Sequence, residues 1–86
     1  MDVAQVKATI SRGNRAAEDG ERTMRSVTDR IEQAYSLAAA TAHDSAHEQV
    51  TATMRRLREA LKEAYRVNEL LKTGAKAATN YSSSLG

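Results

Sequence analysis

Side chains that could bind a metal gather in the middle of the chain, at His43, Asp44, His47 and Glu48. Two histidines four residues apart can share one face of a helix and bind the same zinc ion. However, Ser45 followed three residues later by Glu48 is a capping box, the pattern that begins a new helix. A helix that begins there leaves His43 outside it. We therefore predict polar turn residues, with no metal and no cofactor.

Positive charge gathers further along the chain, where Glu59 and Glu63 interrupt a basic run: Arg55, Arg56, Arg58, Lys62 and Arg66. The chain as a whole has 13 Lys and Arg against 11 Asp and Glu, a net charge of +2. Nucleic-acid surfaces usually carry a cleaner basic stripe or aromatic residues for stacking. We therefore interpret the run as solvated helix surface and expect no nucleic-acid partner.

Catalytic patterns are missing from the sequence. It has no Gly-rich phosphate loop, no Ser-His-Asp set and no cysteine. A short helical chain also has little concave volume in which to desolvate a substrate. We predict that the protein is not an enzyme and binds no small-molecule substrate.

The elements that position these residues are predicted to be two helices. Proline is absent and aromatic residues make up 3% of the chain, which disfavours a sheet. Spacings of three and four residues place apolar residues or glycine on one face of the first half. This stripe consists of Val3, Val6, Ile10, Gly13, Ala17, Gly20, Met24, Val27, Ile31, Ala34 and Ala38. The second stripe consists of Val50, Met54, Leu57, Leu61, Ala64, Asn68, Leu71, Ala75 and Ala78.

The two stripes mirror each other about Asp44, so that Ile31 falls opposite Leu57 and Gly20 opposite Asn68. We therefore predict an all-α fold, an antiparallel two-helix hairpin with helices at about 3–41 and 46–79. Residues 1–86 form a single domain, in which the tail 80–86 either docks or frays. A buried asparagine commonly fixes the register of packed helices, so Asn68 and Gly20 are predicted to set it here.

A lone hairpin of 86 residues buries little apolar surface. Association is the expected supplement, because without cysteines no disulfide can staple the fold. We predict a homodimer that forms a four-helix bundle, or a pair with a sister hairpin. The partner interface is predicted to consist of Leu57, Leu61, Val67, Leu70 and Leu71.

The hairpin architecture resembles the ESAT-6-like (WXG100) proteins of type VII secretion, small chains without cysteines or a signal peptide. That family has a Trp-x-Gly turn, which residues 41–46 lack, and a Tyr-x-x-x-acidic export signal, which Tyr65 and Glu69 match in spelling. The Ala- and Arg-rich composition is also similar to small helical actinobacterial proteins encoded near such systems. The resemblance implies a secreted or secretion-associated interaction module.

Two alternatives stay open beside that function: a cytosolic coiled-coil scaffold or filament subunit, and a basic helical nucleic-acid binder. No apolar run approaches the roughly 20 residues that a membrane span needs. We therefore expect a soluble protein that stays in the cytoplasm or is secreted without a conventional signal peptide.

Overall fold

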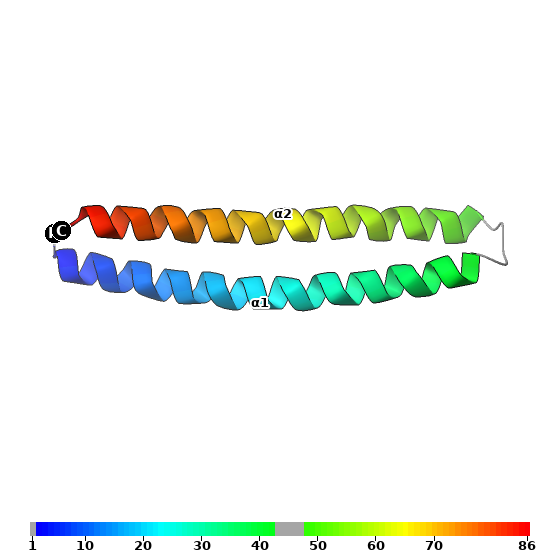
Figure 1. Ribbon diagram of the computed structural model, residues 1–86, viewed down its shortest axis with the longest axis horizontal. Helices are drawn as coiled ribbons and strands as arrows, with labels where there is room; N and C mark the ends of the chain where they lie inside the picture. Colours follow the sequence, from blue (N-terminus) through cyan, green and yellow to red (C-terminus); the bar gives the residue numbers. More distant parts are fainter. Residues whose placement is uncertain (1, 43–47) are drawn as a thin grey trace.

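The computed structural model describes residues 2–42 and 48–86 and confirms an antiparallel helical hairpin (Figure 1). Helix α1 spans Val3–Ala42 and helix α2 spans Glu48–Ser84. The two helices pack along their whole length, and the Cα trace measures 63 × 14 × 14 Å. We call the end with Ala42 and Glu48 the closed end, and the end with Val3 and Ser84 the open end.

Local signals account for the helix ends. The Asp2 carboxylate accepts a hydrogen bond of 2.9 Å from the N–H of Ala4, so Asp2 caps α1. Ser45, the predicted cap of the second helix, lies outside the described residues. Helix α2 continues past residue 79 to Ser84. Beyond it, Gly86 has a positive φ of 87°, the backbone conformation that often ends a helix.

The apolar stripe predicted for the second helix forms the inner face of α2. Every position of that stripe is partly or fully covered by the fold. The same spacing continues through Ser82 and Leu85, which are also partly covered. The periodicity of three and four residues therefore predicted this half of the seam correctly.

The stripe predicted for the first helix is right at most of its positions, but not at all of them. Residues spaced by seven, namely Ile10, Ala17, Met24, Ile31 and Ala38, are covered as expected. Gly13 and Val27 are exposed, although they belong to the predicted stripe. The positions that follow them by one, Asn14 and Thr28, are covered instead. The reason is that one facing helix covers only a narrow strip, and the apolar stripe of α1 is wider than that strip.

The register also differs from the predicted one. The covered residues of the two helices mirror each other about position 46, two residues beyond Asp44. Thr28 and Ala64, which are 7% and 5% exposed, are the two buried residues within 2–42 and 48–86, and they are equally distant from position 46. A Cβ on Gly20 would lie 3.1 Å from Cδ1 of Leu71, so Gly20 faces Leu71 and not Asn68. The predicted mirror about Asp44 was therefore wrong: each residue of α1 lies opposite a residue of α2 four positions further along the chain than predicted, about one helical turn.

Two glycines of α1 provide a matched test of the seam. A Cβ added at Gly13 would meet no atom within 4 Å, whereas one at Gly20 would press on Leu71. We expect Gly13→Ala to stabilise the hairpin by about 1 kcal/mol through helix propensity. Gly20→Ala should gain only about half as much, because the Leu71 side chain must shift. Urea unfolding of both variants measures the difference, and equal gains would contradict the contact between Gly20 and Leu71.

Within the described ranges, neither helix is both long and apolar enough to cross a membrane. The hairpin also contains no completely buried side chain in the part of the chain that the structure describes. Two helices that touch along a single strip leave their flanks open, so the function of the protein must be sought on these flanks.

Candidate interaction surfaces along the two edges

The two long edges of the hairpin differ sharply in charge. Hydrogen bonds between the helices fix which residues share the first edge. The Tyr65 hydroxyl of α2 donates a hydrogen bond of 2.6 Å to the Glu32 carboxylate of α1. Most of the charged residues lie on the same helix faces as these two. We call this side the charged edge, and it holds Arg15, Glu18, Arg22, Arg25, Asp29 and Glu32 of α1 and Glu48, Arg55, Arg58, Lys62, Glu69, Lys72 and Lys76 of α2.

Polar contacts hold the helices together along this charged edge. Arg58 donates a hydrogen bond of 2.6 Å to the Tyr35 hydroxyl, and its guanidinium carbon lies 5.6 Å from the centre of the tyrosine ring. Nearer the open end, the Asn14 amide donates a hydrogen bond of 2.8 Å to the Thr79 hydroxyl. These specific contacts turn α1 so that Asn14 and Tyr35 face the seam.

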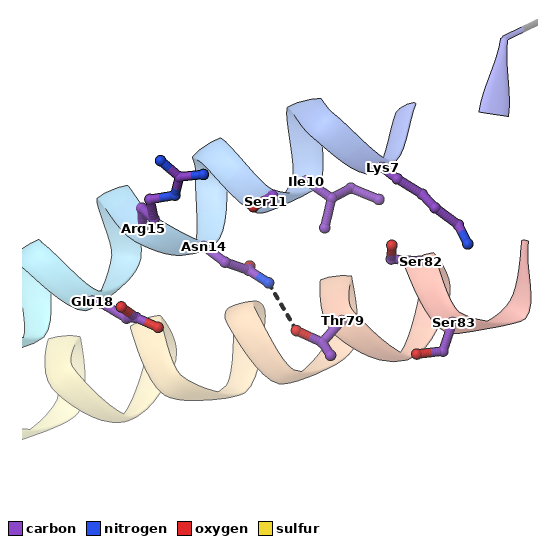
Figure 2. A pocket seen from close by; sticks show the side chains of 9 residues that line it. All are labelled: Lys7, Ile10, Ser11, Asn14, Arg15, Glu18, Thr79, Ser82 and Ser83. Carbon is purple, nitrogen blue, oxygen red and sulfur yellow. Dashed lines mark hydrogen bonds between the residues drawn. The ribbon is translucent and has the colours of Figure 1, made fainter. Parts of the chain in front are cut away.

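A polar hollow of about 250 Å³ surrounds the bond between Asn14 and Thr79 (Figure 2). The other lining residues are Lys7, Ile10, Ser11, Arg15, Glu18, Ser82 and Ser83. Figure 2 shows these side chains spread along both helices, with Arg15 pointing away from the seam. The hollow is shallow and has mixed charge, so it does not form a binding site for one kind of ligand.

The hydrogen bond to Glu32 raises the pKa of Tyr65 above its usual value of 10.0, and the negative charge of Glu32 raises it further. A raised pKa means that the folded hairpin favours the neutral phenol. The contribution of the hydrogen bond between Tyr65 and Glu32 to stability is therefore complete below pH 10. It is lost as the pH rises through the pKa of Tyr65 in the folded state.

The raised pKa predicts that Tyr65 ionises at a higher pH in the folded hairpin than in the unfolded chain. Glu32→Gln should remove this difference. In a Tyr35→Phe, Tyr81→Phe background, Tyr65 is the remaining tyrosine and its phenolate absorbance can be titrated alone. We expect ionisation at a higher pH than in the unfolded chain, and a shift back toward the unfolded value in Glu32→Gln. Identical titration curves with and without Glu32 would contradict the contact.

The opposite edge is nearly free of charge. It carries residues of the α1 stripe that α2 leaves exposed or covers only in part, together with exposed apolar residues of α2. We call it the apolar edge, and it holds Val6, Gly13, Ala16, Gly20, Val27, Ala34 and Leu37 of α1 and Ala60, Val67, Leu70, Gly74, Ala77 and Tyr81 of α2. The charged residues among the described positions of this edge are Arg30, Arg56 and Glu63.

An apolar hollow of about 270 Å³ opens on the apolar edge, in the half of the hairpin nearer the open end. Gly13 and Gly74 lie at its rim, and apart from Asn14 its lining is apolar: Ile10, Ala17, Leu71, Ala75 and Ala78. Glycine and alanine leave this volume empty because they carry little or no side chain. The hollow can therefore accept a large apolar side chain from outside the hairpin.

The structure divides the predicted partner interface into two groups. Leu57, Leu61 and Leu71 are partly covered and belong to the seam inside the hairpin. Val67 and Leu70 are 41% and 58% exposed and lie on the apolar edge. Of the five predicted contact residues, these last two are the ones whose side chains lie open to a partner.

The predicted register residue Asn68 lies in the seam, partly covered by α1. Its Oδ1 atom is buried and has no hydrogen-bond partner among the described residues. Asn68 is not the single amide of the seam, because Asn14 is also covered and is bonded to Thr79. Sequence periodicity missed Asn14 because it placed the neighbouring Gly13 in the seam.

The remaining predicted sites do not gather into one place. His43, Asp44 and His47 lie outside the described residues, and elsewhere in the described chain no group of three potential metal ligands forms. The basic run is spread over several faces: Arg55 and Arg58 lie on the charged edge, while Arg66 pairs with Glu63 at 3.4 Å.

Tyr65 and Glu69, which match the spelling of an export signal, both lie in the interior of α2. Tyr65 is bonded to Glu32, and the Glu69 carboxylate lies 3.8 Å from the Lys72 ammonium group.

Comparison with known proteins adds no family to this description. No protein-family model matches the chain, and the searches of curated proteins and of solved structures give no significant match.

Proposed function

We propose that the protein is a non-enzymatic protein–protein interaction module that pairs through its apolar edge with another helical hairpin. The observation that carries this proposal is the exposure of Val67 and Leu70 on an edge with few charges. Contiguous exposed apolar surface on a small protein usually marks an interaction site. A partner would cover these side chains and supply the core that the hairpin does not build by itself.

The double substitution Val67→Ser, Leu70→Ser tests this proposal. Both side chains are exposed on the hairpin, so we expect little change in its helicity. Each apolar side chain covered in a complex contributes about 1.5–3 kcal/mol, so the double variant should weaken association at least about tenfold. Sedimentation at micromolar concentration measures the change.

The matched control is Lys62→Ser, which removes a long exposed side chain from the charged edge. It should leave association unchanged. Wild-type binding by the Val67 and Leu70 variant would contradict an interaction through the apolar edge. Equal losses in both variants would contradict the difference between the edges.

A finer proposal is that this association serves type VII secretion, as the resemblance to ESAT-6-like proteins implies. The two-helix architecture supports it, whereas the missing Trp-x-Gly turn does not. Its test is the culture medium of a producer with an active type VII system. Export that depends on Tyr65 and Glu69 would support the proposal, and a protein found only in the cell lysate would contradict it.

A further inference from the structure

We propose that the apolar edge pairs with the apolar edge of a second copy, with the closed ends of the two copies at the same end of a four-helix bundle. This inference rests on the proposed function and specifies its partner and geometry. Two copies related by a twofold axis along the bundle place α1 of one beside α2 of the other. The mirror about position 46 then determines which residues lie level across the interface.

Large and small side chains match in this arrangement. On α2, Thr79 lies level with Gly13 and is two positions from Tyr81. Tyr81 and Leu70 are exposed on the hairpin, whereas Gly13 has open space beside it. Each copy therefore offers the protruding Tyr81 of α2 close to the open space beside Gly13 of the other copy.

The charges on the apolar edge also match. The residue of α2 level with Arg30 is next to Glu63, so each Arg30 falls beside Glu63 of the second copy. Arg30 has no ion-pair partner in the described part of its own chain, and the contact between Glu63 and Arg66 is long and exposed. If the copies ran in opposite directions, α1 would face α1, and Arg30 would lie near Gly13 of the other copy.

The available area is sufficient for a stable dimer. An edge 63 Å long and 14 Å wide covers roughly 900 Å², and specific interfaces bury about 800 Å² on each partner. A stable dimer therefore needs to bury the whole apolar edge of each copy. This requires the two copies to lie side by side over their full length. The second copy meets this condition because its edge has the same length.

Spin labels at Ala40→Cys test the orientation, since the chain has no other cysteine. Ala40 is exposed near the closed end of α1. With the closed ends together, the two labels should lie roughly 30 Å apart, the thickness of two hairpins of 14 Å. With the closed ends apart, the separation should exceed roughly 50 Å, because it then spans most of the helix length.

Substitutions on the same edge test the contacts. We expect Glu63→Arg to weaken dimerisation several-fold, and Arg30→Glu together with Glu63→Arg to restore it. Glu59→Arg, which makes the same charge change off the apolar edge, is the matched control and should have little effect. Gly13→Leu should preserve the hairpin, because a side chain there meets open space, but should weaken the dimer by collision with Tyr81 of the second copy.

The outcomes separate this inference from the proposed function. A chain that stays monomeric, or a dimer with labels more than 50 Å apart, would overturn the arrangement. If association nevertheless depended on Val67 and Leu70, the proposed function would stand. A further outcome is a dimer with close labels and an affinity that the substitution of Val67 and Leu70 leaves unchanged. That result would contradict association through the apolar edge, and with it both proposals.

Discussion

Ala64→Glu is expected to unfold the hairpin. Ala64 is 5% exposed at the centre of α2, where it lies level with the buried Thr28. A glutamate side chain there would be too large for the space, and its carboxylate would lose water without finding a cation. Burial of an unpaired charge and overpacking together cost at least about 3 kcal/mol, a large part of the stability of a chain this small.

Far-ultraviolet circular dichroism measures this loss as a fall in helicity. Ala60→Glu is the matched control, because Ala60 is exposed one turn earlier on the same helix. That variant should keep its helicity while it weakens association, since Ala60 lies on the apolar edge. Native helicity and an unchanged melting temperature in Ala64→Glu would show that residue 64 is not inside the seam.

Asn68→Leu is expected to stabilise the hairpin by about 1–3 kcal/mol. The buried Oδ1 atom of Asn68 has no hydrogen-bond partner among the described residues, so folding removes it from water without compensation. Leucine has a similar size, removes this penalty and adds apolar contact within the seam. The free energy of unfolding in urea measures the gain.

Asn14→Leu is the matched control for Asn68→Leu. Asn14 also lies in the seam, but its amide donates a hydrogen bond of 2.8 Å to Thr79, which the substitution would break. Its gain should therefore be much smaller, or a loss. If Asn68→Leu destabilised the hairpin instead, the Asn68 amide would have to make a stabilising bond, as the predicted role in fixing the register requires.

The difference between the two edges links these predictions. The charged edge carries the hydrogen bonds that set the register, such as that between Tyr65 and Glu32. The apolar edge carries side chains that the register leaves uncovered, such as Val27 and Val67. A substitution in the seam should therefore change helicity, whereas one on the apolar edge should change association alone.

The amino-acid sequence by itself determined the two helices and the inner face of α2. Regular spacing of apolar residues, the absence of proline and the Asp2 cap are local signals, and each depends on residues at most four positions apart. On α2, the large apolar residues Leu57, Leu61 and Leu71 lie on one face, and this face turns inward as predicted. Val67 and Leu70 lie beside this stripe, and their contact with a partner stays a prediction.

Only the tertiary structure decided which part of the wider α1 stripe faces α2. Gly13 and Asn14 are neighbours on α1, and the apolar spacing alone does not decide which of them faces α2. The choice follows from contacts between residues far apart in the chain, such as Asn14 with Thr79. These contacts turn α1 so that Asn14 and Thr28 face α2, and they move the mirror point from position 44 to position 46. Gly13 and Val27 then lie exposed on the apolar edge.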